Sequence, residues 1–215
     1  MNNRKMNWKE KIGYVFDYYK WWVLGGVVLI GVLIYALHYS VQIHPDTIAG
    51  VTLVNADTIT VEESDWLENY IEENNISKTD RILVDASLAI HMDGSNPASS
   101  QSYQVLSAEL LSSEIDLLIT DQDTFEYINS AGTMMPLTEL LSQEQLEMYS
   151  EQLIYLENSA TKKVEPVGIS MENCSTLKEE HFFKEDEKII VAGIPTLSEH
   201  QEEAVKLVMY LLREN

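Results

Sequence analysis

IDLLITDQDTFEYINS, residues 115–130, places a short apolar run directly before an amphipathic helix. The first half, IDLLIT, is typical of a strand that is buried on both faces. Asp121 or Asp123 is suited to cap the helix that follows, and Phe125 and Ile128 lie on the inner face of that helix. A strand that leads within one turn into a helix is the repeating unit of an α/β sheet.

The same alternation of apolar runs and amphipathic stretches continues on both sides of this unit. Strands are expected at 51–54, 81–89, 115–120, 164–170 and 188–194, and helices at 60–75, 103–111, 123–130, 142–155 and 198–213. Turn-forming residues at 93–101 predict a loop, and 136–141 predicts a helical turn. Strands separated by helices of this length predict parallel βαβ units, so residues 50–215 are expected to form one α/β domain.

An uncharged apolar segment precedes this domain. Residues 21–39, WWVLGGVVLIGVLIYALHY, contain no Lys, Arg, Asp or Glu. A helix of that length measures about 28 Å, close to the thickness of the hydrocarbon layer of a bilayer. Trp21 and Trp22 lie at one end and Tyr35 and Tyr39 near the other, as aromatic residues do at membrane interfaces. The segment is therefore predicted to be a transmembrane helix.

The flanking charges predict the orientation of this helix. Residues 1–20 hold five basic residues against two acidic ones, and the next basic residue is Lys78. The positive-inside rule then places 1–20 in the cytoplasm and the domain outside, at the plasma membrane. No small-x-small cleavage site follows the apolar run, so an uncleaved anchor is expected in place of a signal peptide. Residues 40–49, which contain Pro45, are expected to form a short stalk.

The outer domain is strongly acidic. The whole chain carries a formal charge of −21, with 14 basic and 35 acidic residues. Such a domain repels nucleic acid, whose affinity for proteins depends on Lys and Arg. The single cysteine, Cys174, can make no intramolecular disulfide and is expected to be buried or half-buried.

The C-terminal half resembles a known family of binding proteins. The order IDLLITD, FEYINSAG and MMPLTELLS is similar to that in extracellular solute-binding proteins of the type II periplasmic-binding fold. The positions that carry the resemblance are Asp116 to Asp121, Gly132, Pro136-Leu137, VEPVGISM at 164–171, and 191–212 with Ala204. The N-terminal part resembles membrane-anchored proteins of Clostridia-like bacteria.

The resemblance implies a two-lobed domain with a ligand cleft between the lobes. It assigns 50–102 plus 166–215 to one lobe and 103–165 to the other. The domain has about 170 residues, so it would be a shortened member of the family, held by a helix in place of a lipidated cysteine.

Polar residues that follow the predicted strands are the candidate ligand-binding residues. Open α/β sheets bind ligands at the carboxyl ends of their strands. This rule selects Asn55, Asp85, Ser87, Thr120, Asp121 and Ser170. The segment from Thr120 to Asp123 could hold a polar ligand or a cation, or its aspartates could simply cap the following helix.

The sequence lacks the common motifs for catalysis, cofactor binding and metal binding. It contains no P-loop, no GxGxxG, no GxSxG and no pair of histidines at metal-ligand spacing. No catalytic residue, cofactor or metal is therefore expected. His200 is isolated in the sequence and is expected at the surface.

Two functions remain open on these grounds. The chain is either a membrane-tethered module that captures a small solute or regulates a transporter, or a non-catalytic interaction module of the cell envelope that has lost ligand binding. A hydrolase is disfavoured because no nucleophile is paired with a base. A polar and aromatic cleft at the strand ends favours the first function, and an exposed apolar patch favours the second.

Overall fold

The computed structural model divides the chain into two compact units, Met1–Pro45 and Asp46–Asn215. The residues it describes are 8–43, 46–77, 79–91, 98–158, 162–179, 181–183 and 189–213. The predicted loop at 93–101 therefore lies partly outside the described residues, as do the first seven residues of the predicted cytoplasmic segment.

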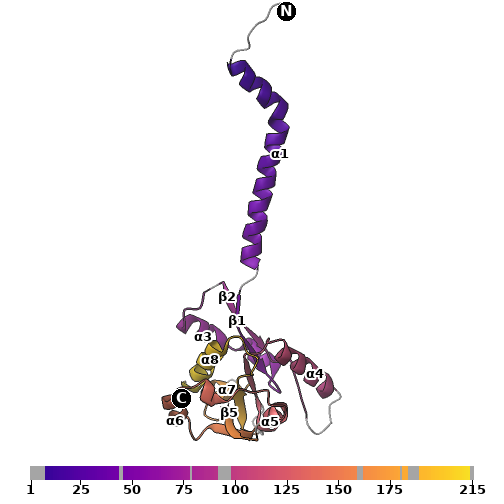
Figure 1. Cartoon of the computed structure of the whole chain (residues 1–215). Helices are drawn as coiled ribbons and strands as arrows, with labels where there is room; N and C mark the ends of the chain where they lie inside the picture. The colour runs from indigo at the N-terminus through magenta and orange to yellow at the C-terminus, as the bar shows by residue number, and fades with distance from the viewer. Residues whose placement is uncertain are drawn as a thin grey trace, which may run out of the picture. The chain divides into compact units, whose positions relative to one another are not determined.

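A single long helix forms the described part of the first unit. Helix α1 spans Trp8–Ile43, and its stretch Tyr18–Tyr39 is long and apolar enough to cross a membrane (Figure 1). Such a helix near an N-terminus is either a membrane anchor or a signal sequence. The predicted stalk is largely regular structure, because 40–43 belong to α1 and 46–49 belong to the first strand.

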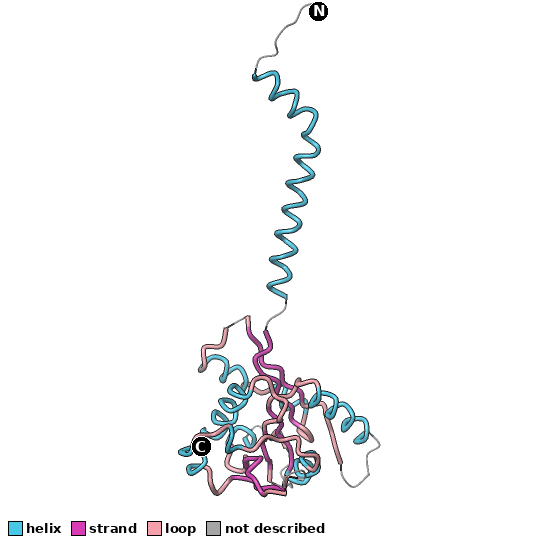
Figure 2. The backbone as a smooth tube through the Cα atoms, viewed as in Figure 1, coloured by secondary structure: helices cyan, strands magenta, loops and turns pink. Residues whose placement is uncertain are grey.

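The second unit is built on one mixed sheet of six strands in the order β2-β1-β3-β6-β5-β4 (Figures 1 and 2). Its strands are β1 (Asp46–Leu53), β2 (Asp80–Asp85), β3 (Leu117–Asp121), β4 (Leu153–Glu157), β5 (Val164–Ser170) and β6 (Ile190–Gly193). Strands β2, β1 and β3 are parallel, and β6, β5 and β4 follow with antiparallel pairing. The α/β class is confirmed, with a sheet that is only partly parallel.

Helices cover both faces of this sheet. They are α2 (Thr58–Glu63), α3 (Trp66–Glu73), α4 (Ala98–Leu111), α5 (Gln122–Asn129), α6 (Gln143–Met148), α7 (Ser175–Glu179) and α8 (Gln201–Arg213), with a 3-10 turn η1 at Leu137–Glu139. Figure 1 shows α3 and α8 on one side and α4 on the other. The link from β1 to β2 runs through α2 and α3, and the link from β2 to β3 runs through α4. The first crossover thus places β2 on one side of β1, and the second passes over β1 and places β3 on its other side.

Each face of the sheet has its own apolar core. On the first face, Tyr70 of α3 and Leu207 of α8 pack in one cluster with Leu117 of β3. On the second face, Leu106 of α4 and Phe125 of α5 pack in another cluster that includes Leu118. The alternation of Leu117 and Leu118 between the two clusters follows from the period of two along a strand. The domain is therefore a three-layer α/β/α sandwich.

Some local predictions differ from the structure. The helix expected at 60–75 is two helices, which meet at Ser64 and Asp65. The helix expected at 142–155 begins as predicted, with Ser142 in a capping box, but α6 ends at Met148. Residues 153–157 form β4, because antiparallel pairing with β5 satisfies their backbone groups.

The structure also bears on the two suggested lobes. Strand β4 lies in the segment assigned to one lobe, and β5 is split between the two assignments. Both strands are in the same sheet as β1, and Asp46–Asn215 is one compact unit. Segments assigned to both suggested lobes therefore contribute strands to one sheet.

Gly168 and Gly193 make room for the ring of Phe125. A side chain at either position is therefore expected to lower stability. A Cβ atom at Gly193 would lie 2.5 Å from the Phe125 ring. We expect Gly193→Ala to lower the free energy of unfolding by about 1–3 kcal/mol, because overpacking forces the ring or the strand to move. Urea unfolding of the full chain followed by tryptophan fluorescence measures this change. Gly13, with nothing near its Cβ position, is the control, and an equal loss at both glycines would contradict the prediction.

Candidate functional site

Two of the predicted site residues meet at the carboxyl ends of β1 and β3. Because β2 and β3, the two strands that follow β1 in the chain, lie on opposite sides of it, this position is the topological switch point where α/β sheets commonly bind ligands. Asn55 follows β1, and Asp121 ends β3. Asn55 has a φ of 67°, a left-handed conformation that asparagine tolerates better than most residues.

The side chain of Asn55 bonds to three parts of the domain. Its Nδ2 donates to Asp121 Oδ2 at 2.7 Å, to Thr124 Oγ1 at 3.1 Å and to the carbonyl of Ile90 at 3.0 Å. Its Oδ1 accepts from the main-chain N–H of Ile90 at 2.7 Å. Asn55 therefore ties the end of β1 to the segment after β2 and to the start of α5.

Asp121 acts as the N-cap of α5. Its Oδ1 accepts from the main-chain N–H of Thr124 at 3.2 Å, and its Oδ2 accepts from the Thr124 hydroxyl at 2.8 Å. Capping was one of the two roles weighed for this aspartate. At the switch point the side chains of Asn55, Asp121 and Thr124 thus bond to one another and hold β1, β3 and α5 together.

Thr120 and Ser170 lie inside the sheet and are separated from each other. Both pair with Val191 of β6, one from each side, so two inter-strand spacings of about 4.8 Å separate them. Ser170 Oγ accepts from the N–H of Glu172 at 3.3 Å. Thr120 is fully buried, and within the described part of the chain its hydroxyl has no hydrogen-bond partner.

Asp85 and Ser87 form a local turn after β2. Asp85 Oδ1 accepts from the N–H of Ser87 at 2.7 Å. Partial burial raises the pKa of Glu109, and the nearby charges of Asp85 and Glu114 add to this effect. This group of carboxylates is therefore mutually repulsive, and the structure does not join Asp85 or Ser87 to Asn55 or Asp121 by any hydrogen bond in the described residues.

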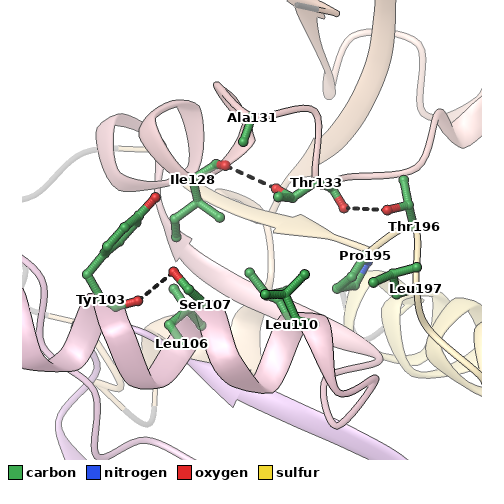
Figure 3. Close-up of a pocket in the computed structure, with 11 residues that line it drawn as sticks. Tyr103, Leu106, Ser107, Leu110, Ile128, Ala131, Thr133, Pro195, Thr196 and Leu197 are labelled. Carbon is green, nitrogen blue, oxygen red and sulfur yellow. Dashed lines mark hydrogen bonds between the residues drawn. The ribbon is translucent and has the colours of Figure 1, made fainter. Parts of the chain in front are cut away.

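A pocket lies near the opposite edge of the sheet, where β3 begins (Figure 3). Its volume is about 220 Å³. It is lined by α4, by the end of α5 with the segment after it, and by the turn after β6; the lining residues are Tyr103, Leu106, Ser107, Leu110, Leu111, Ile128, Ala131, Thr133, Pro195, Thr196 and Leu197. Most of this surface is apolar, as in most sites for small molecules.

Main-chain contacts join two walls of the pocket. The N–H of Thr196 donates to the carbonyl of Thr133 at 2.9 Å, and the N–H of Met135 donates to the carbonyl of Ile194 at 2.8 Å. Met134 and Pro195 form an isolated β-bridge between the same segments. The segment after α5 and the turn after β6 therefore hold each other in place.

A buried carboxylate anchors the turn that forms the second of these walls. Asp116 lies just before β3, and its Oδ1 accepts from the Ser198 hydroxyl at 2.7 Å and from the N–H of His200 at 3.0 Å. Its Oδ2 accepts from the N–H of Gly50 at 2.8 Å and from His200 Nδ1 at 3.1 Å. These bonds connect β1, the start of β3 and the segment that leads into α8.

The Asp116 network predicts a loss of stability in acid. Burial alone would raise the pKa of Asp116, but the bonds from Ser198, Gly50 and His200 outweigh it and hold this pKa below the ordinary 3.8. A carboxyl group whose pKa is lowered by folding stabilises the folded state above its unfolded pKa. That stability disappears as the pH falls through the folded value.

Urea unfolding of the wild type and of Asp116→Asn, measured from pH 7 to pH 3, tests this relation. We expect the difference in unfolding free energy between the two proteins to shrink as the pH falls below about 4. A difference that grows below about pH 4 would show that the folded pKa of Asp116 is raised.

Neither the pocket nor the Asp116 network was found in the sequence. His200, expected as an isolated surface residue, is part of the network, although its side chain remains partly exposed. One signal of the pocket is visible in hindsight. Positions 103, 106, 107, 110 and 111 of α4 follow helical spacing, and this stripe continues past the buried Leu110 to Leu111, which is 75% exposed.

The described residues hold no metal site, and the chain matches no known protein with which it was compared. Among the described residues, no group of three or more His, Cys, Asp or Glu side chains is placed to hold a metal ion. Cys174 is buried, as expected. Comparison with protein-family models, with curated proteins and with solved structures found no match.

Proposed function

We propose that this chain is a single-pass membrane protein whose acidic domain lies outside the cytoplasm and captures a small solute. The observation that carries the proposal is the apolar pocket of about 220 Å³ between α4, α5 and the turn after β6. The domain would act as a solute-binding-protein-like module, which holds its solute at the membrane or passes it to a transporter.

The charges on both sides of α1 support this topology. Five basic residues precede the apolar stretch, and no basic residue follows it until Lys78. The positive-inside rule then favours a cytoplasmic N-terminus. The absence of a small-x-small site after the apolar run favours an anchor over a cleaved signal sequence.

The geometry of the pocket supports capture by the domain itself. The resemblance to solute-binding proteins implies a cleft between two lobes, whereas residues 46–215 form one compact unit. The polar groups at the switch point bond to one another. The pocket near the opposite edge has walls held together by main-chain hydrogen bonds, so it is the better site for a solute.

A thermal-shift screen of the full chain in nanodiscs tests solute capture. The library contains sugars, amino acids, short peptides and small aromatic compounds. A solute at 100 times its dissociation constant adds about 2.7 kcal/mol to the stability of the folded state. The same screen on Ser107→Phe, which fills the pocket, should lose the shift, because Ser107 lines the pocket.

Ser100→Phe is the matched control for this screen. Ser100 is on the same helix, is exposed and does not line the pocket, so this variant should keep the shift. A hit that survives in Ser107→Phe binds elsewhere. A library that gives no hit with the folded wild type would count against solute capture.

Cysteine labelling in intact cells tests the topology. In a Cys174→Ala background, a cysteine is placed either at Asn2 or at the exposed Glu144. A membrane-impermeant maleimide should label Glu144→Cys and leave Asn2→Cys unlabelled until the cells are opened. The reverse pattern would refute the orientation, and a chain that has lost its first 40 residues would indicate a cleaved signal sequence.

The mouth of the pocket supports a second candidate function, an interaction module of the envelope. Leu111 is 75% exposed and Leu197 is 48% exposed. Exposed apolar residues that lie together mark contact sites for other proteins. If the solute screen gives no hit, site-specific crosslinking from position 111 in cells, compared with crosslinking from the exposed Glu144, would test this function.

A further inference from the structure

We propose that the solute of this pocket is a small amine, in which a protonated nitrogen is attached to one aromatic ring or one short branched chain. This inference rests on the proposed solute capture and adds the chemical class of the ligand. Three properties of the pocket support it: its volume, the hydrogen bonds of its hydroxyl groups and the charge of the segments that surround it.

The volume limits the apolar part of the ligand. Pockets for drug-sized ligands measure roughly 300–1,000 Å³, and an engineered apolar cavity of about 150 Å³ binds benzene. At about 220 Å³, this pocket has room for one ring or one branched chain with a few additional atoms. A disaccharide, a nucleotide or a peptide of several residues is too large to be enclosed.

Three of the four hydroxyl groups in the walls already donate a hydrogen bond to a main-chain carbonyl, and the fourth belongs to Tyr103 (Figure 3). Ser107 Oγ donates to the carbonyl of Tyr103 at 2.7 Å, Thr133 Oγ1 donates to the carbonyl of Ile128 at 3.0 Å, and Thr196 Oγ1 donates to the carbonyl of Thr133 at 3.2 Å. A hydroxyl group has one proton and two lone pairs, so these three groups can only accept a further hydrogen bond. They therefore favour a ligand that donates, such as an ammonium group.

The charge of the surrounding chain favours the same ligand. Helices α4 and α5 and the segment after α5 lie within residues 82–161, which contain 13 acidic residues and no Lys or Arg. The third wall is the turn at 195–197, and Glu199 follows it in the sequence. A surface of one sign raises the local concentration of the opposite ion and repels ions of its own sign. A carboxylate or phosphate ligand is therefore disfavoured here.

An aromatic pair beside the pocket provides a further contact for a cation. The rings of Tyr103 and Tyr127 lie 5.2 Å apart, and Tyr103 lines the pocket. The face of a tyrosine ring attracts an ammonium group within about 6 Å. An amine thus combines burial of its apolar part with hydrogen bonds to wall oxygens and with contact to this ring.

Three probes of nearly equal size and different charge test the proposal. Benzylamine, benzyl alcohol and benzoate are titrated by calorimetry at pH 7 into the full chain in nanodiscs of zwitterionic lipid. We expect benzylamine to bind about tenfold more tightly than benzyl alcohol, and benzoate to bind most weakly. Raising the salt concentration should weaken the binding of benzylamine alone, because only this binding depends on attraction between opposite charges.

Two further variants separate a role in binding from a role in folding. Thr196→Val removes one acceptor at nearly constant volume and should lower the preference for benzylamine over benzyl alcohol. Ser107→Phe should abolish the binding of all three probes, and the exposed control Ser100→Phe should leave binding unchanged. A change in the ratio of two affinities cannot be produced by a partial loss of folding.

The outcomes distinguish the amine proposal from solute capture in general. Equal or tighter binding of benzyl alcohol that is lost in Ser107→Phe would overturn the amine class and leave solute capture standing. No binding of benzylamine to the wild type would also overturn the amine class. Solute capture itself would fall only if the broad screen gave no hit that Ser107→Phe removes.

Discussion

Asp116→Ala is expected to lower the free energy of unfolding of residues 46–215 by about 3–5 kcal/mol. The substitution removes a buried carboxylate that accepts hydrogen bonds from Gly50, Ser198 and His200. The main-chain N–H groups of Gly50 and His200 would then lie in the interior without an acceptor. Leaving a buried donor unsatisfied costs about 1–3 kcal/mol for each group, and this cost accounts for the large total.

Urea unfolding of the full chain in nanodiscs measures this loss. Asp116→Asn keeps the shape and one acceptor oxygen, so it should lie between the wild type and Asp116→Ala. Asp65→Ala is the control, because Asp65 is exposed and makes no side-chain cap bond at the start of α3. The control should change stability by less than about 1 kcal/mol. Similar losses for Asp65→Ala and Asp116→Ala would contradict the importance of the network.

Asp116→Ala also has an expected effect on the proposed ligand site. Asp116 holds Ser198 and His200, which follow directly on the wall residues 195–197. Loss of this anchor should weaken the binding of benzylamine under conditions in which the variant is still folded. Asp116 is in this sense a positioning residue, and Asp65→Ala should leave the affinity unchanged.

Phe125→Ala is the second substitution with a large expected effect, again about 3–5 kcal/mol. Phe125 is fully buried in the core between α4, α5 and the sheet, and its ring packs against Gly168 and Gly193. The two glycines have no side chains that could move into the space of the ring, so removal of the ring leaves a cavity. The free energy of unfolding in urea is the measurement.

Tyr127→Ala serves as the control for Phe125→Ala. Tyr127 is on the same helix and is 40% exposed, so its truncation should cost much less. The double variant Phe125→Leu/Gly193→Ala adds a second test, because a smaller side chain relieves the clash with a new Cβ. The two changes should cost less together than the sum of their separate costs. Strict additivity would mean that the ring and the glycine are not in contact.

The sequence by itself determined the elements whose signals are local. The apolar stretch 21–39 predicted the long helix α1, because no other part of the sequence has a stretch of that length without a charged residue. The unit 115–130 predicted β3 and α5 with Asp121 or Asp123 as the cap, because a buried run and a capping side chain are encoded within a few positions. The structure assigns the cap to Asp121. The α/β class followed from the repetition of such units.

Local patterns failed where pairing between strands decided the structure. Residues 153–157 continue an apolar pattern that also suits a helix, and β5 turns them into a strand by supplying hydrogen-bond partners. Segment order alone resembles a two-lobed protein, but the pairing of β3, β6, β5 and β4 unites the segments in one sheet.

The candidate site was decided almost entirely by the tertiary structure. The rule for strand ends selected Asn55 and Asp121, and the structure shows that these two side chains bond to each other at the switch point. The pocket is made from three segments that lie far apart in the sequence, around Ser107, Thr133 and Thr196. Which groups face each other across such a space depends on the packing of α4 and α5 on the sheet, and no local pattern encodes that packing.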